Sequence, residues 1–178
     1  YVFCGIARSF GDPDGDFWLI KTDATGETVW SHIYGNSLAD LAWCVRQTQE
    51  GGYIVAGYTT RSNGVPDVWL IKTDENGDSL WSRTYGVPNI GESALSIIQT
   101  QDGGYAIAGG SGAFAGSALL LKTDADGNLL WTRSFGGSSW EEAYDILQTA
   151  DGSVVIASIT RSFGSGAQDA WLIKTEPD

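Results

Sequence analysis

An eight-residue motif occurs four times along the chain, and this recurrence limits the possible folds more than any other feature. The copies read DFWLIKTD at 16–23, DVWLIKTD at 67–74, SALLLKTD at 117–124 and DAWLIKTE at 169–176. Their lysines are spaced by 51, 50 and 52 residues and are Lys21, Lys72, Lys122 and Lys174. Repeats of this period are typical of propellers and other arrays, in which each small unit packs against the next.

Two further series share this period. One begins at a tryptophan and reads WSHIYG at 30–35, WSRTYG at 81–86 and WTRSFG at 131–136. The other reads QTQEGGYIVAG at 47–57, QTQDGGYAIAG at 99–109 and QTADGSVVIAS at 148–158, with YVFCG at 1–5 as a shortened first member. Together the three series predict units of four short antiparallel strands joined by tight turns, with Gly26, Gly77 and Gly127 at turn positions that need a positive φ. The abundance of glycine, 24 residues, agrees with a turn-rich all-β protein that has almost no helix.

The third strand of the unit carries a continuous apolar run, Val68-Trp-Leu-Ile71, instead of alternating apolar and polar residues. Such a run indicates that the strand is buried on both faces. One four-stranded unit cannot cover its own faces, so the units should stack as blades around an axis. We therefore predict an all-β fold, a β-propeller or propeller segment of about four repeats. The expected single domain spans 1–178, with a partial blade at 1–35, blades at 36–86 and 87–137, and a partial blade at 138–178.

The first and last blades are each expected to have three strands. Three arrangements fit this expectation: a four-bladed ring with thinner terminal blades, an arc completed by another copy, and a segment of a longer propeller. Because the chain opens at Tyr1 within a repeat, the expectation that fits best is a segment of a longer parent chain.

The pattern GGYIVAGYT…DVWLIKTDENGDSLWSRTYG resembles the secreted or surface-associated repeat propellers of archaea and bacteria, which are distantly similar to the quinoprotein-like (PQQ-like) propellers. The likeness covers essentially the whole chain. It implies that the tryptophans four residues after the turn glycines, Trp30, Trp81 and Trp131, dock between adjacent blades. Trp18, Trp69 and Trp171 in the third strands are expected to be blade-docking residues as well. Because this fold carries enzymes, scaffolds and receptors alike, the resemblance implies little about activity.

No motif in the sequence predicts catalysis. The quinoprotein enzymes hold their cofactor against adjacent cysteines, whereas the two cysteines here, Cys4 and Cys44, lie far apart in apolar runs. We interpret them as buried thiols, although a disulfide is an alternative. The single histidine, His32, occupies the column that Arg83 and Arg133 fill in the other repeats. We therefore predict that the protein is not an enzyme and needs no cofactor.

A candidate binding site lies where recurrent charges should converge at one mouth of the blade assembly. Carboxylates recur just before the first strand of the unit, as Asp40, Glu92 and Glu141. Arginines recur in the loop between the second and third strands, as Arg8, Arg61 and Arg161. Charges of both signs could bind a polar ligand or a cation; the alternative is that they pair with one another and hold the loops in place.

Calcium is a further possibility at the turns between the third and fourth strands. The segments 74–78, DENGD, and 124–128, DADGN, are rich in oxygen ligands. They lack a closing bidentate glutamate, and the equivalent segment at 23–27, DATGE, keeps the glycine but has fewer oxygen ligands. A plain hairpin is therefore the preferred interpretation, and no metal site is predicted.

The net charge of −12 disfavours binding to nucleic acid or to anionic membrane surfaces. No apolar run approaches the length of about 18 residues that spans a bilayer, so membrane insertion is not predicted. We expect a non-catalytic binding or scaffolding module, extracellular or on a cell surface, that presents loops to a protein or glycan ligand. One alternative is a structural unit that assembles into homo-oligomers through exposed terminal strand edges. The other is a glycan-active hydrolase or lyase that uses the recurrent carboxylates.

Overall fold

The chain is built from β-strands arranged in four antiparallel sheets. The computed structural model describes residues 1–9, 13–112 and 116–177, and these residues contain no helix and hence none that could span a membrane. The first sheet consists of β1 (Val2–Ala7), β2 (Asp16–Thr22) and β3 (Thr28–Tyr34). The second consists of β4 (Asp40–Gln47), β5 (Tyr53–Thr60), β6 (Pro66–Thr73) and β7 (Ser79–Tyr85). The third consists of β8 (Glu92–Gln99), β9 (Tyr105–Ser111), β10 (Ser117–Thr123) and β11 (Leu129–Phe135), and the fourth of β12 (Glu141–Gln148), β13 (Val154–Thr160) and β14 (Asp169–Lys174).

Within each sheet, strands that follow one another in the chain lie side by side. This meander confirms the prediction of four repeated antiparallel units with three strands in the first and last. The register also repeats. The pairs β2–β3, β6–β7 and β10–β11 each contain a bulge directly after the motif lysine, which is Lys21, Lys72 and Lys122 in turn. Gly26, Gly77 and Gly127 have φ of +94°, +88° and +77°, as predicted for these turns.

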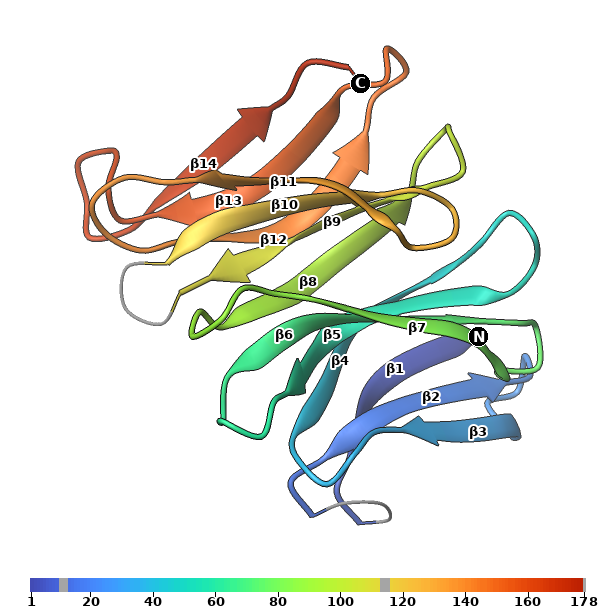
Figure 1. The fold of residues 1–178 in the computed structure, drawn as a ribbon. Helices are drawn as coiled ribbons and strands as arrows, with labels where there is room; N and C mark the ends of the chain where they lie inside the picture. The colour runs from blue at the N-terminus through green and yellow to red at the C-terminus, as the bar shows by residue number, and fades with distance from the viewer. Residues whose placement is uncertain (10–12, 113–115, 178) are drawn as a thin grey trace.

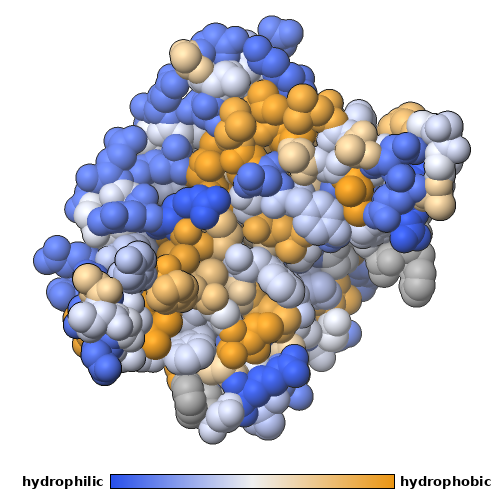
Figure 2. Space-filling view, turned by 180° about the vertical axis from the view of Figure 1, so that it is seen from behind, coloured by the Kyte–Doolittle hydropathy of each residue, from blue (hydrophilic) through white to orange (hydrophobic). Residues whose placement is uncertain are grey.

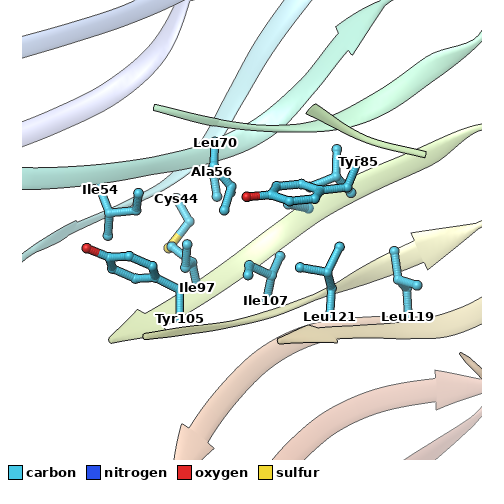
Figure 3. Close-up of a cluster of buried hydrophobic side chains, with 12 residues drawn as sticks. Cys44, Ile54, Ala56, Leu70, Tyr85, Ile97, Tyr105, Ile107, Leu119 and Leu121 are labelled. Atoms are coloured by element: carbon cyan, nitrogen blue, oxygen red, sulfur yellow. The ribbon is translucent and has the colours of Figure 1, made fainter. Parts of the chain in front are cut away.

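The cores lie between the sheets, not within them. We call the side of a sheet that faces the next sheet along the chain its trailing face, and the side that faces the preceding sheet its leading face. The largest cluster joins the trailing face of the second sheet, including Ile54 and Leu70, to the leading face of the third, including Ile97, Ile107 and Leu121. Figure 3 shows these side chains pointing toward one another from two facing sheets. Similar clusters join the first sheet to the second and the third to the fourth.

The first strand of a sheet makes much of this contact. Strands β4, β8 and β12 each pack against the preceding sheet as well as against their own second strand. The burial of the strands depends on this packing between sheets. In β6, which has a sheet on either side, the stretch Leu70–Thr73 is buried, whereas in β14 only Ile173 is buried. A repeat unit is therefore covered on both faces only when a unit precedes it and another follows it.

The four sheets do not close into a ring. In Figure 1 the first sheet and the fourth sheet lie at opposite ends of the stack, with the second and third sheets between them. Each end of the stack therefore presents one sheet face that none of the other three described sheets covers.

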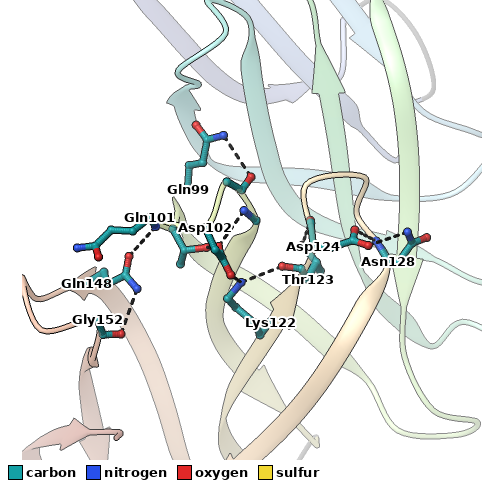
Figure 4. Close-up of polar contacts among 12 residues, drawn as sticks. Gln99, Gln101, Asp102, Lys122, Thr123, Asp124, Asn128, Gln148 and Gly152 are labelled. Carbon is teal, nitrogen blue, oxygen red and sulfur yellow. Dashed lines mark hydrogen bonds and ion pairs between the residues drawn. The ribbon is translucent and has the colours of Figure 1, made fainter. Parts of the chain in front are cut away.

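Polar contacts also join neighbouring sheets, at the hairpins between first and second strands. The backbone N–H of Gln49 donates to Oε1 of Gln99 in the next sheet, and that of Gln101 donates to Oε1 of Gln148, both at 2.9 Å. Figure 4 shows the second of these contacts. The Gln of the QT motif is thus an inter-sheet link. Because it recurs with the repeat, the same contact forms at successive joints.

The lysines of the repeated motif hold the same hairpins from within their own sheet. Lys122 Nζ lies 2.7 Å from Asp102 and donates to the carbonyl of Thr123, as Figure 4 shows. Lys174 forms the equivalent ion pair with Asp151 at 3.0 Å. Of these two lysines, Lys122 is almost completely buried and Lys174 is exposed, since β10 has a fourth strand beside it and a sheet after it, and β14 has neither.

Candidate functional site

A pocket of about 430 Å³ opens among the loops at one end of the sheets. It is bordered by the β5–β6 loop, the β7–β8 loop, the end of β9 and the start of β12, so three of the four sheets contribute to it. The polar and aromatic residues that line it are Tyr58, Trp140, Glu92, Glu141, Glu142, Ser93, Ser111 and Asn89. We call this the loop pocket.

Glycines give the loop pocket its room. A Cβ atom at Gly110 would lie 3.2 Å from Oε1 of Glu142, and one at Gly116 would lie 3.1 Å from Cδ1 of Trp140. Any larger residue at these two positions would press on the side chains that line the pocket. The position of Glu142 is set in addition by Tyr144, whose hydroxyl donates to Oε2 of Glu142 at 2.7 Å.

Of the three recurrent carboxylates, Glu92 and Glu141 border the loop pocket. Glu141 is buried and well satisfied. Its Oε2 accepts the N–H of Gly137 at 2.9 Å, and its Oε1 accepts the hydroxyl of Thr160 at 2.9 Å and the N–H of Ser162 at 3.1 Å. Burial opposes ionisation, but the hydrogen bonds from Ser162, Gly137 and Thr160 together outweigh it and lower the pKa of Glu141. Glu141 therefore holds the β11–β12 loop to the end of β13.

Glu92 is buried at the equivalent position but has far fewer partners. Its Oε1 accepts the N–H of Val87 at 3.3 Å, and its Oε2 is buried without a hydrogen-bond partner among the described residues. Burial is the main cause that raises the pKa of Glu92, and the neighbouring carboxylate of Asp67 adds to it. This is the one recurrent carboxylate that both borders the pocket and retains unused hydrogen-bonding capacity.

Asp40 is fully buried and binds its own loop. Its Oδ2 accepts the N–H of Asn36 at 2.8 Å, and its Oδ1 accepts the side-chain amide of the same residue at 3.2 Å. Burial is the first cause that raises the pKa of Asp40, and the carboxylate of Asp16 also raises it. Asp40 is not among the residues of the loop pocket.

None of the three recurrent arginines is among the residues that line the loop pocket, and each takes different partners. Arg61 forms a bidentate ion pair with Asp67 and donates to the carbonyl of Val87 at 3.1 Å. The guanidinium of Arg161 lies 5.1 Å from the ring centre of Trp140. Arg8 is exposed, and its charge lowers the pKa of Tyr58 against the stronger effect of burial. The arginine series therefore lies outside the pocket lining, and it does not form one set of repeated ion pairs with the recurrent carboxylates.

The tryptophans after the turn glycines lie on the joints between sheets. Trp30 of the first sheet packs edge-on against Tyr53 of the second, with ring centres 5.8 Å apart. Trp81 of the second packs in the same way on Tyr105 of the third at 6.0 Å. Trp131 packs against the cluster between the third and fourth sheets.

The tryptophans of the repeated eight-residue motif, which lie on β2, β6 and β14, are on the leading faces of their sheets. Trp69 packs on Phe17 of the first sheet, with ring centres 4.4 Å apart. The indole N–H groups of Trp18 and Trp69 each donate to a serine on the next strand, Ser31 and Ser82, at 2.7 Å. Trp171 packs against the cluster between the third and fourth sheets.

A further inter-sheet bond was not predicted from the sequence. The hydroxyl of Tyr34 donates to the carbonyl of the turn residue Gly77 in the second sheet, and that of Tyr85 donates to Gly127 in the third at 2.7 Å. The third sheet has Phe135 at this position, and the described part of the fourth sheet has no third turn to accept such a bond. The change from YG to FG in the third copy is the signal that could have revealed this bond.

In the turns at 74–78 and 124–128, which the sequence offered as possible calcium sites, the first aspartate accepts hydrogen bonds from the backbone of its own turn. Oδ1 of Asp74 accepts the N–H groups of Asn76 and Asp78 at 2.8 and 3.0 Å, and Oδ1 of Asp124 accepts those of Asp126 and Asn128 at 3.0 and 2.7 Å. Within the described residues, no group of three or more histidine, cysteine, aspartate or glutamate side chains is placed to hold a metal ion. Cys4 and Cys44 are free thiols.

Sequence reasoning missed most of the loop pocket, namely Tyr58, Ser93, Ser111, Trp140 and Glu142. Apart from Ser111, whose equivalents are Thr59 and Thr160, these residues depart from the repeat. The positions equivalent to Trp140 hold Ala39 and Gly91 in the second and third sheets. A search for departures from the shared pattern, and not for recurrence, would have pointed to Trp140.

No protein-family model matches this chain, and no curated protein matches it. Eight solved chains match it, among them a hypothetical protein from Leishmania major with a TM-score of 0.54 and 12% sequence identity. That match covers 98% of this chain and 63% of the solved chain. At this identity the likeness concerns the fold alone.

Proposed function

We propose that this protein is a non-catalytic binding module whose four sheets are blades of an open β-propeller segment and whose ligand occupies the loop pocket. The propeller interpretation is supported by the recurrent packing of β4, β8 and β12 against the preceding sheet. The observation that carries the binding proposal is the loop pocket itself. Its volume lies within the range of about 300–1,000 Å³ that is usual for ligand sites. Loops on a rigid scaffold are also where recognition is commonly found.

The lining favours a neutral ligand rich in hydroxyl groups, such as a sugar unit of a glycan. Carboxylates accept hydrogen bonds but do not donate them when ionised, so the ligand has to supply donors. Tyr58 and Trp140 offer flat apolar surfaces against the carbon-bound hydrogens of such a ligand. A cationic ligand is less favoured because Arg161 already lies over the ring of Trp140 and Arg61 lies near Glu92.

Catalysis by the recurrent carboxylates has less support. Glycoside hydrolysis needs two carboxyl groups in unlike states at a suitable separation across one bond. Glu141 uses both oxygens to hold its own loop, and Asp40 does not border the pocket. We place the module outside the cell because of its acidic composition, with a net charge of −12.

The test is binding of a panel of neutral disaccharides (maltose, cellobiose and lactose), followed by tryptophan fluorescence and by isothermal titration. We expect at least one of them to bind, and Trp140→Ala and Glu142→Gln to weaken that binding by about tenfold or more. The matched control is Glu27→Gln, which removes the same charge from an exposed turn at the opposite end of the strands.

n-Butylammonium serves as the cationic probe in the same experiment. Binding of n-butylammonium without binding of any disaccharide would show that the pocket selects cations and would overturn the proposed ligand class. Equal loss of binding in Glu27→Gln and Glu142→Gln would overturn the location of the site.

A further inference from the structure

The two ends of the stack present apolar sheet faces that no other sheet within residues 1–9, 13–112 and 116–177 covers. Exposed apolar side chains gather at several places on the surface, as Figure 2 shows for one side of the molecule. On the trailing face of the fourth sheet, Leu172 is 71% exposed. Its cross-strand partner Ala157 is also exposed, and Ile159 lies on the same face opposite Ala170. On the leading face of the first sheet, Tyr1 is 73% and Phe3 is 53% exposed.

The repeat itself shows what such faces are made to contact. Leu172 occupies the position of Leu70 in the second sheet and Leu120 in the third, and both of these leucines are fully buried. They are buried by the leading face of the next sheet. Ala157 likewise occupies the position of Ala56 and Ala108, which are also fully buried at the joints.

The leading face of the first sheet is the counterpart of these covering faces. Phe3 occupies the position of Val55, Ile107 and Ile156, each of which is at most 1% exposed and packs on the preceding sheet. Tyr1 occupies the position of Tyr53 and Tyr105, on which a tryptophan of the preceding sheet packs. The chain therefore carries both halves of the joint that it uses three times internally, one half at each end of the stack.

We propose that the trailing face of the fourth sheet binds the leading face of the first sheet of a second copy of this chain, head to tail. The partner is a second copy because every covered trailing face among the described sheets packs on a leading face of this same repeat. Such an interface is heterologous, so two or more copies close a ring if the rotation per copy closes it and otherwise form an open chain. This assembly goes beyond the proposed ligand binding, which uses the loops and not the faces.

The joint between copies is weaker than the internal joints. Internally, Trp30 and Trp81 of a fourth strand pack over Tyr53 and Tyr105. The described fourth sheet consists of three strands, so Tyr1 of the incoming copy meets no tryptophan of this kind. Association is therefore reversible and depends on protein concentration, whereas the internal joints persist.

The test is the mass of the 178-residue chain in solution, followed by analytical ultracentrifugation over a range of concentrations. The wild type is expected to exceed the 19.0 kDa of one chain increasingly as concentration rises. Leu172→Asp places a charge in the joint and is expected to weaken association by about tenfold or more. Leu80→Asp is the matched control, since Leu80 is 62% exposed on β7 and lies outside both end faces. Ala157→Arg is a second variant on the same face as Leu172.

A mixing experiment tests the head-to-tail geometry. Phe3→Asp weakens the leading face and Leu172→Asp weakens the trailing face, so at a concentration where the wild type associates each variant alone should be largely monomeric. A mixture is expected to form heterodimers, because each variant retains the face that the other lacks. A wild type that stays monomeric at all concentrations overturns the proposal. So does association that is lost in Leu172→Asp but unchanged in Phe3→Asp, which would indicate that two trailing faces pair.

Discussion

The sharpest consequence of the site geometry concerns two glutamates at the same position of successive repeats. In Glu141→Gln, an amide NH₂ replaces one of two oxygens that both accept hydrogen bonds from Gly137, Thr160 and Ser162. At least one buried donor then faces another donor. Each polar group left unsatisfied in this way costs about 1–3 kcal/mol, so the free energy of unfolding should fall by about 2–3 kcal/mol at pH 7.

Glu92→Gln should behave differently. Glu92 accepts one long hydrogen bond from Val87, its Oε2 has no partner, and burial raises its pKa. A neutral amide removes the cost of burying that charge. The free energy of unfolding is therefore expected to stay level or to rise by up to about 1 kcal/mol at pH 7.

The assay is urea unfolding followed by fluorescence, with the shift in midpoint read at an unchanged m-value. The pH dependence supplies a second readout. The folded-state pKa of Glu141 is lowered, so its contribution to stability is present above its unfolded pKa of about 4.5 and is lost as the pH falls through the folded value. The folded-state pKa of Glu92 is raised, so its penalty shrinks as the pH falls below the folded value and is gone below the unfolded pKa of about 4.5. Equal losses of stability in the two variants, or a larger loss in Glu92→Gln, would refute this reasoning.

Three further predictions concern single contacts. Tyr85→Phe removes the bond to the third sheet and should lower the free energy of unfolding by about 1 kcal/mol in chemical denaturation, whereas Tyr1→Phe, at an exposed position, should leave it unchanged. Burial opposes ionisation of Asp102, but hydrogen bonds from Lys122 and other donors lower its pKa to about 2. About 1 kcal/mol of stability should therefore be lost between about pH 4 and pH 2, after allowance for solvent screening of the exposed carboxylate, and Asp102→Asn should show a smaller loss over that range. Burial raises the pKa of Cys4 to about 12, so iodoacetamide at pH 8 should modify it far more slowly in the folded chain than in urea, as mass spectrometry would show.

The repeated features of the fold could be predicted from the sequence because recurrence reports on shared packing. The four-stranded unit, the positive φ of Gly77 and the burial of Leu70 on a doubly covered sheet all follow from the period and the apolar run. The same reasoning treats Leu172 as equivalent to Leu70, yet Leu172 is exposed. The difference lies in the missing following sheet and the missing fourth strand beside β14, and not in the local sequence, so the motif alone could not reveal it.

The candidate site was harder to predict for the opposite reason. Recurrence drew attention to Asp40, Glu92 and Glu141, whose shared task is largely to hold the loops before the first strands. The pocket owes its shape to residues that break the repeat, above all Trp140, and to loops whose relative positions depend on how three sheets stack. Spacing along the chain carries no information on which loops of different sheets come together in this way.

The central claim is that each sheet is stabilised by the face of the next one, and a single series of leucine-to-alanine variants tests it most directly. Leu70, Leu120 and Leu172 share one position of the repeat, but only Leu70 and Leu120 are covered by a following sheet and lie on a strand with a neighbour on both sides. The measurement is the free energy of unfolding of each variant at a concentration low enough to keep the chain monomeric. Leu70→Ala and Leu120→Ala should each lose about 3 kcal/mol, and Leu172→Ala less than about 1 kcal/mol. Similar losses at all three positions would contradict the account, because the leucines would then owe their stabilising effect to their own sheets.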